Sequence, residues 1–427
     1  MILRKLLRAK QTQVSGGVLP WVLGVGIIVA ALCFALLLQT GYQSQLSAQY
    51  RWQREVHRIA ASGLAWFMAD AQAYPLGVPT PVVLPGDPPD TVWVERSSWG
   101  VWEFARSQAQ KGMYQAGKAS LLGHKPTAEG RLALYVKENG RPLAVAGDNI
   151  IRGDVKVPAS GFRTAYINRV GYRKAEYVLG NQGKSEAKMP PVSTILAETF
   201  LEQQAHWPIV PPDQQDSLFS LDNVYWSFME AAPLVVSVQG ILRLKGYWAG
   251  YIQIRASEGI IVDPSAQLSQ VILEAPYITM AKGASVQAQL WVRDSARLMA
   301  GSRLEYPSAV VLRDPSPRAQ FTMESGSSMG GVLWGWFDSE INTQRIATLD
   351  PGATLVGQVY WPGGFEPQEA TVLGQVVCDY LYLRIQRGQW INHLYGATLD
   401  ARARPEEYIM PPLWSHQPNR VPFLDLP

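Results

Sequence analysis

The sequence predicts a mainly β protein in which a single N-terminal transmembrane helix continues into a juxtamembrane helix, followed by an exported β-solenoid domain. Three observations predict this fold class. An uncharged run extends from Val18 to Leu38, a helical apolar stripe follows from 46 to 67, and small residues recur at strand corners between 241 and 360. Together they divide the 427-residue chain into an anchor, a connecting helix and a large β-rich part.

The first element is the transmembrane helix at 18–39. The uncharged run from Val18 to Leu38 has 21 residues, and a helix needs about 20 to cross a hydrocarbon core. Basic residues at positions 4, 5, 8 and 10 precede it within the leader 1–17. This bias places the N-terminus in the cytoplasm and exports the remainder. A cleaved secretory peptide is the alternative, but Gln39 to Tyr42 offers no convincing cleavage site.

The second element is an amphipathic helix over 40–74 that continues the membrane helix. Its apolar residues recur at steps of three and four: Leu46, Tyr50, Val56, Ile59, Ala60, Leu64 and Phe67. This stripe either binds a protein partner or packs on the globular part of the same chain. Six prolines then fall between Pro75 and Pro89, which predicts a linker at 75–91 and excludes a regular helix or a central strand.

The remaining residues, 92–427, are predicted to form a β-rich exported region with solenoid coils clearest at 241–360. In this stretch a small residue follows a corner, with an aliphatic residue two positions later. The residues at this position are Ala266, Ala284, Ala296, Ala309 and Ala353, at spacings of 18, 12, 13 and 44. Short strands meeting at corners, stacked coil on coil, produce such a pattern. An antiparallel β-sandwich with Pro and Gly turns is the alternative.

The net charge and the cysteine content limit which partners and which kind of fold are expected. The formal net charge is +3, and the basic residues beyond position 10 are scattered along the sequence, which predicts no nucleic-acid binding. Cys33 lies in the predicted span and Cys378 near the end, so no disulfide framework is expected.

No residue pattern predicts catalysis, a cofactor or a metal. The five histidines have no ligand partner at metal spacing, and Ser325 to Gly331 resembles a nucleophile elbow only in composition. Some β-solenoids cleave acidic polysaccharides with clustered carboxylates and basic groups. The residues that suggest such a cluster are Arg293, Asp294, Arg313 and Asp314. Asp-Pro and Asp-Ser are ordinary at corners, so we expect no enzyme.

The N-terminus resembles minor pilins and the atypical pseudopilins of type II secretion. The residues that carry the resemblance are the stretch from Lys10 to Gly17, the apolar span, and the small residues Ala60 to Ala65. In that family a peptidase cuts after a glycine and the helix packs into a filament. The resemblance implies a leader-processing site between Gly17 and Val18. The glutamate usual at the fifth mature position is replaced by Val22.

The β-rich region resembles uncharacterised single-span envelope proteins of Bacteroidetes-type bacteria and, more distantly, the bactofilin class of polymer-forming β-solenoids. Gly147-Asp148, the Gly153 to Pro158 segment, Gly161 and the Gly357 to Tyr360 segment carry this resemblance. It implies a rigid exported domain and no known activity. Bactofilins are usually much shorter than this chain.

These features predict a non-enzymatic protein of the bacterial inner membrane, single-pass, with its bulk periplasmic or extracellular. Its partners would be the membrane and proteins that bind the N-terminal helix, in a structural or assembly role within a pilus-like or secretion system. The alternative is an exported polysaccharide-binding or polysaccharide-cleaving protein. The aromatic candidates for sugar stacking are Tyr247, Trp248, Tyr251, Trp334, Trp336 and Trp361.

Overall fold

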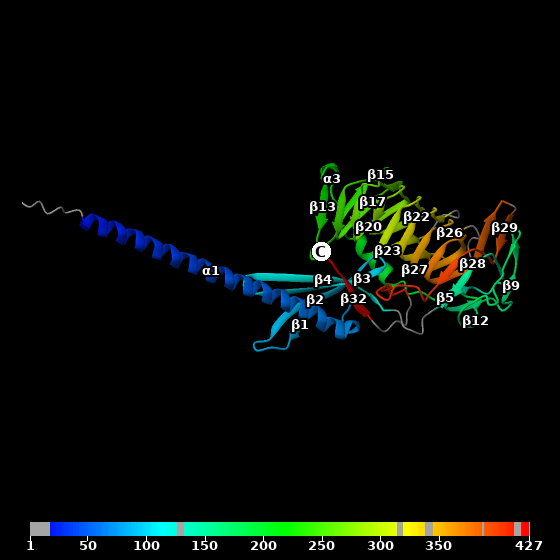
Figure 1. Ribbon diagram of the computed structural model, residues 1–427, viewed down its shortest axis with the longest axis horizontal. Coiled ribbons are helices and arrows are strands. Elements are labelled where there is room, and N and C mark those ends of the chain that lie inside the picture. The colour runs from blue at the N-terminus through cyan, green and yellow to red at the C-terminus, as the bar shows by residue number, and fades with distance from the viewer. Residues whose placement is uncertain are drawn as a thin grey trace, which may run out of the picture.

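The computed structural model describes residues 18–125, 132–313, 319–337, 345–386, 388–413 and 420–426. Two parts are distinguished by their strand pairing (Figure 1). We call residues 18–124 together with 420–426 the sheet module, and residues 132–413 the parallel module. The predicted leader 1–17, which includes Gly17, lies outside the described residues.

Helix α1 (Val18–Ala69) is a single element of 52 residues. The prediction of an apolar N-terminal helix is confirmed, and the helix runs without interruption past Gln39. Its only proline, Pro20, sits in the first turn, where the missing N–H costs no hydrogen bond. The short 3₁₀ helix η1 (Ala71–Ala73) ends the helical segment just before Pro75.

The sheet module is a five-stranded antiparallel sheet in the order β1-β2-β3-β4-β32. Its strands are β1 (Thr80–Leu84), β2 (Asp90–Trp99), β3 (Trp102–Lys111), β4 (Tyr114–His124) and β32 (Arg420–Leu426). The segment 75–91, predicted as a linker, contains β1. This strand lies at the sheet edge, where Pro81 is tolerated because its absent N–H leaves no ladder bond unmade.

The C-terminal residues pair with β4 through β32. Residues 92–427 are therefore not one continuous unit. The parallel module is inserted between β4 and β32, two neighbouring strands of the same sheet. Periodicity along the chain does not reveal such an insertion, because the pairing joins residues about 300 positions apart.

The parallel module contains short strands and two helices, α2 (Ile195–Gln204) and α3 (Pro212–Phe219). The strands up to α2 are β5 (Leu132–Val136), β6 (Leu143–Ala146), β7 (Ile150–Arg152), β8 (Asp154–Val157), β9 (Phe162–Thr164), β10 (Tyr166–Ile167), β11 (Val170–Gly171) and β12 (Gln182–Lys184). The strands after α3 are β13 (Asn223–Trp226), β14 (Leu234–Val238), β15 (Ile241–Leu244), β16 (Tyr247–Gly250), β17 (Ile252–Ala256), β18 (Gly259–Val262), β19 (Gln267–Ser269), β20 (Val271–Met280), β21 (Ser285–Val286), β22 (Ala288–Leu298), β23 (Arg303–Arg313), β24 (Gln320–Met323), β25 (Ser328–Trp336), β26 (Ile346–Leu349), β27 (Thr354–Pro367), β28 (Thr371–Ile385), β29 (Gly388–Ile391), β30 (His393–Tyr395) and β31 (Thr398–Asp400).

Most of these strands pair in parallel, and their pairings close on themselves as a barrel. One long ladder joins β14, β17, β20, β22, β23, β25, β27, β28, β5, β8 and β12 in that spatial order. A second ladder begins at β15 and β18, and a third at β13 and β16. An antiparallel β-sandwich, the alternative fold, is therefore wrong.

The core lies between the ladders. At one register position of the first ladder every paired residue through Val155 is a buried aliphatic: Val236, Ile254, Leu273, Leu290, Val310, Leu333, Val359, Val376, Leu134 and Val155. Inward-facing side chains at matched positions stack on one another, which removes apolar surface from water along the whole ladder.

The small-residue pattern occupies three different places. Ala266, Ala284 and Ala353 are buried at turns that lead into the third ladder. Ala296 instead lies within β22, paired with Ile278 and Phe321 in the second ladder. Ala309 lies on the outer face of the first ladder. The irregular spacings of 12 and 13 residues arise from mixing these places.

Chain order and spatial order differ in the parallel module. The early strand β5 pairs with the late strand β28, and β7 pairs with β31, so residues 132–188 stack beyond the last strands. The chain then returns through α2 to begin the other end at β13. Figure 1 shows β5, β9 and β12 beside β28 and β29, far from the free end of α1.

Candidate functional surfaces

The first candidate surface is the free part of α1. Its buried residues all lie between Val56 and Phe67, where the helix packs on the sheet. The N-terminal part projects away from the body (Figure 1), and its most apolar window is wholly exposed. In the described part of the chain, α1 is the helix long and apolar enough to cross a membrane. Val18, the predicted first residue after processing, begins it.

The predicted amphipathic stripe has two parts: one packs on the same chain, and the other is exposed, as binding to a partner would require. Val56, Ile59, Ala60, Leu64 and Phe67 pack against the chain's own sheet. Leu46 and Tyr50 remain exposed, as do Trp52 and Trp66. The alternative of packing on the same chain therefore accounts for the later half of the stripe, and the earlier half stays available to a partner.

The junction between the two modules is the next feature. The β2–β3 hairpin places Trp99 against Phe200, Phe228 and Tyr251, with ring centroids 4.7–6.0 Å apart. The Trp99 indole N–H donates to the Gln270 carbonyl oxygen at 2.8 Å. Trp99 is fully buried, so the hairpin tip packs into the outer face of the first ladder.

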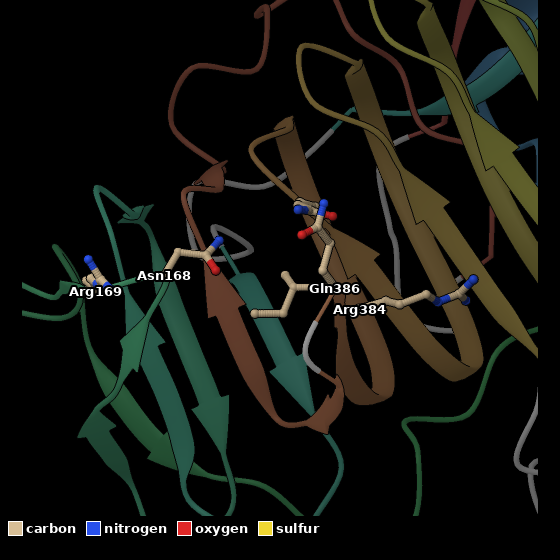
Figure 2. A pocket seen from close by; sticks show the side chains of 6 residues that line it. Asn168, Arg169, Arg384 and Gln386 are labelled. Carbon is tan, nitrogen blue, oxygen red and sulfur yellow. The ribbon is translucent and has the colours of Figure 1, made fainter.

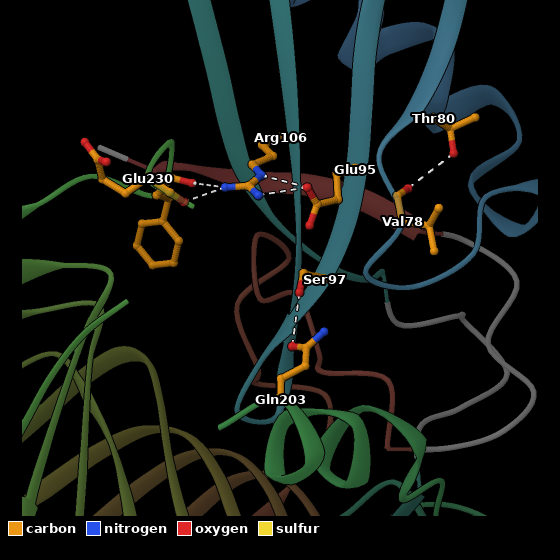
Figure 3. Close-up of polar contacts among 8 residues, drawn as sticks. Val78, Thr80, Glu95, Ser97, Arg106, Gln203 and Glu230 are labelled. Atoms are coloured by element: carbon orange, nitrogen blue, oxygen red, sulfur yellow. Dashed lines mark hydrogen bonds and ion pairs between the residues drawn. The ribbon is translucent and has the colours of Figure 1, made fainter. Parts of the chain in front are cut away.

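Polar contacts reinforce this junction. Figure 3 shows Arg106 between Glu95 of β2 and the backbone of the parallel module. Its guanidinium donates to Glu95 Oε2 at 2.8 Å and to the Glu230 carbonyl oxygen at 2.6 Å. Ser97 donates to Gln203 Oε1 at 3.2 Å, which ties β2 to α2. The sheet module thus holds the parallel module through side chains on two strands.

A buried charge cluster lies in the sheet beside β32. Glu103 is 1% exposed and lies 3.0 Å from Arg420 Nε and 3.5 Å from Arg96 Nε. Burial raises the pKa of the Glu103 carboxyl, although Arg420 and Arg96 oppose that shift. Burial, with help from Arg420, lowers the pKa of His124 to about 4. His124 ends β4 and is neutral at pH 7.

The basic and acidic residues that suggested a polysaccharide-cleaving cluster lie only partly together. Arg293 and Arg313 line one cavity of about 360 Å³, together with Arg255, Glu274 and Trp291. Asp294 forms an ion pair with Arg293 at 3.4 Å, and Asp314 lies outside the described residues. Glu274 is the one carboxylate among the described lining residues, and it accepts a hydrogen bond from Gln253 at 2.8 Å. Sequence spacing missed Arg255 and Glu274, which strand pairing brings to this place.

Most of the aromatic candidates for sugar stacking are unavailable to a ligand. Trp248, Tyr251, Trp334 and Trp361 are buried, with at most 4% of their surface exposed. Tyr247 is 38% exposed, and Trp336 stacks on Trp334 at 5.1 Å. Packing rather than sugar binding explains the four buried rings.

A larger cavity of about 790 Å³ lies at the end of the parallel module far from α1. Asn168 and Arg169, from the β10–β11 turn, line it with Arg384 and Gln386, which follow one another closely at the end of β28. Figure 2 shows the side chains of Arg169 and Arg384 at opposite sides of this cavity rather than converging on one point.

Within the described ranges, no group of three or more His, Cys, Asp and Glu side chains is placed to hold a metal ion. Ser325 and Gly326 form a turn that leads into β25, which contains Ser328 to Gly331, so no helix follows as in a nucleophile elbow. Comparison with known proteins adds no family: no family model, no curated protein and no solved structure matches this chain.

Proposed function

We propose that this protein is a non-enzymatic, single-pass protein of the bacterial inner membrane that acts in structure or assembly, as a minor component of a pilus-like or secretion system. Its N-terminus is cytoplasmic and both modules are exported. The proposal rests on α1, because one continuous helix combines a membrane-spanning length with a packed distal part.

The division of α1 is the observation that carries this proposal. A membrane anchor alone needs about 20 residues, whereas α1 has 52 and about 17 of them separate Leu38 from the first buried residue, Val56. That exposed stretch carries Leu46, Tyr50 and Trp52 on its surface. Exposed apolar and aromatic side chains on a helix are suited to contact with another helix. The resemblance to minor pilins supplies the kind of assembly.

We propose further that the parallel module is a β-solenoid that serves as a rigid exported body. Parallel pairing at matched register positions, repeated along three ladders, supports this interpretation. Each turn packs on its neighbours through main-chain hydrogen bonds and stacked side chains, which favours stiffness over conformational change.

The N-terminal sequence of the protein extracted from membranes of its native host tests the assembly role. We expect a start at Val18, and we expect Gly17→Leu to leave Met1 in place. Gly16→Leu is the matched control, since it changes the neighbouring glycine and should still be processed. An intact Met1 in the unaltered protein would leave only a plain anchor and defeat the pilin-like assignment.

A second candidate function is an exported polysaccharide-binding or polysaccharide-cleaving protein. The cavity lined by Arg255, Glu274 and Arg293 favours it, because guanidinium groups bind carboxylates of acidic sugars. Incubation of the full chain with polygalacturonate should release no new chain ends under the primary proposal. Release that Arg293→Ala abolishes would make cleavage the function.

A further inference from the structure

The basic residues that look scattered in the sequence gather at one end of the parallel module. We call residues 139–188 the distal cap, since β6 to β12 lie there, beyond β28. It contains nine Lys and Arg and four Asp and Glu, a net charge of +5 against +3 for the whole chain. All nine basic side chains are exposed.

The segment that leads from the cap to the opposite end has the opposite sign. Residues 189–230, which include α2 and α3, contain six acidic residues and no Lys or Arg. The asymmetry is therefore not a general excess of positive charge. A cap of one sign attracts anions over about 10 Å at moderate salt, and charges at the other end are too distant to cancel it.

Aromatic rings lie among these charges. Tyr177 stacks on Phe162 at 5.3 Å and on Tyr172 at 5.1 Å, with interplanar angles of 10° and 19°. All three rings are partly exposed, and Tyr166 on the neighbouring hairpin is 82% exposed. Arg163 and Arg173 flank the stack in sequence and are themselves exposed. Aromatic faces contact the C–H faces of sugar rings, and guanidinium groups hold carboxylate or sulfate groups.

From these observations we propose that the distal cap is a binding surface for an acidic polysaccharide. The cap points away from the free end of α1 (Figure 1), so a membrane-anchored chain presents it to the outside. This choice of partner rests on the proposed function, in which both modules are exported. It extends the alternative function, polysaccharide binding, to a new surface. It does not depend on the arginine cavity between β17 and β23.

Several exposed contacts acting together set the expected strength. Each exposed ion pair strengthens binding only about twofold, so loss of three weakens binding roughly tenfold. The attraction falls as salt screens it, and an aromatic contact persists at high salt. Tyr172→Ala should therefore weaken binding at both low and high salt, by about threefold.

The test uses the full chain in neutral detergent, with polygalacturonate as the probe and uncharged dextran and single-stranded poly-dT as comparisons. Binding is measured by interferometry at low and high salt. The variant Arg163→Ala, Arg173→Ala, Lys174→Ala should lose roughly tenfold in affinity for polygalacturonate. The control variant Lys245→Ala, Lys282→Ala, Arg303→Ala removes the same charge from exposed positions outside the cap and should bind normally.

Equal losses in the two triple variants would overturn the proposal, as would binding of dextran as tight as that of polygalacturonate. Tighter binding of poly-dT would assign the cap to nucleic acid instead. Self-association at low salt, seen by light scattering and lost in the cap variant, would assign it to the acidic end of a second copy. A processed start at Val18 with no polygalacturonate binding would remove this inference and leave the assembly role standing.

Discussion

The sheet module and the parallel module are built by opposite rules. In the sheet module β1 to β4 follow one another through short hairpins, and each strand pairs with its neighbour in sequence. In the parallel module most strands pair with one about 17–27 residues away, and β5 even pairs with β28. The first arrangement is local and forms around a helix, whereas the second needs a complete stack of strands to bury its core.

The difference teaches where each module is vulnerable. The sheet module depends on the fit of α1 against one face, with Gly63 at the point of closest approach. The parallel module depends on backbone positions that repeat from strand to strand, such as Gly331, Gly357 and Gly374, which share φ values near +145°. Substitutions at these glycines, at the junction and in the buried charge cluster should therefore have different effects on the two modules.

The largest effect is expected for Gly357→Ala. A Cβ there would lie 1.9 Å from the Gly331 carbonyl oxygen, and the φ of +143° is open mainly to glycine. We expect a loss of about 4–5 kcal/mol in the free energy of unfolding, or failure to fold. Guanidinium titration of the full chain in detergent measures it. Gly283→Ala, with φ +77° and open space around it, should cost only about 1–2 kcal/mol. Equal losses would contradict the stacking rule.

Trp99→Ala tests whether the two modules unfold as one. Removing this buried ring leaves a cavity against Phe200 and Tyr251 and should cost about 3–5 kcal/mol. Because the ring joins the modules, we also expect one thermal transition for the native chain and two for the variant. Trp361→Ala deletes an equally buried ring within the parallel module and should lower stability without splitting the transition. A split in neither variant would show that the junction does not depend on Trp99.

His124 makes the buried charge cluster at β32 sensitive to acid. Its folded pKa of about 4 lies below the ordinary value of 6.5, so the unfolded chain binds more protons between these pH values. Stability from this group is present above pH 6.5 and is lost as pH falls toward 4, on the order of 3 kcal/mol at most. The raised pKa of Glu103 acts in the opposite direction, since its contribution falls as pH rises above 4.5.

Unfolding free energies of the native chain and of His124→Asn, measured side by side from pH 7 to pH 4, isolate the histidine. The variant should lose less stability on acidification than the native chain. Parallel pH profiles for the two proteins would show that His124 does not titrate in this range.

Gly63→Ala is expected to have the smallest effect of the four test substitutions. Alanine in a helix normally gains about 1 kcal/mol over glycine, but a Cβ at position 63 would lie 2.5 Å from Ser107 Oγ and 2.6 Å from Val92 Cγ2. We expect a net loss of about 1–2 kcal/mol by denaturant titration. Gly41→Ala has open space around it and should be neutral or slightly stabilising. A gain at both positions would contradict the close helix–sheet contact.

Part of this architecture follows from the sequence and part does not. The apolar run from Val18 and the helical period up to Phe67 are local signals, and they predict α1 correctly. The pairing of β32 with β4 and the stacking of β5 on β28 leave no local signal, because any two apolar strands have similar patterns. The gathering of Arg163, Arg173 and Lys184 in the distal cap depends on that same unpredictable stacking.

The insertion between β4 and β32 also sets the path of mechanical load. A pull along α1 reaches the parallel module through only two covalent crossings, one after His124 and one before Arg420, which enter the sheet as adjacent strands. Between those crossings, Trp99 and Arg106 carry force through non-covalent contact. The tip of the β2–β3 hairpin therefore transmits force between α1, with the sheet on which it packs, and the parallel module.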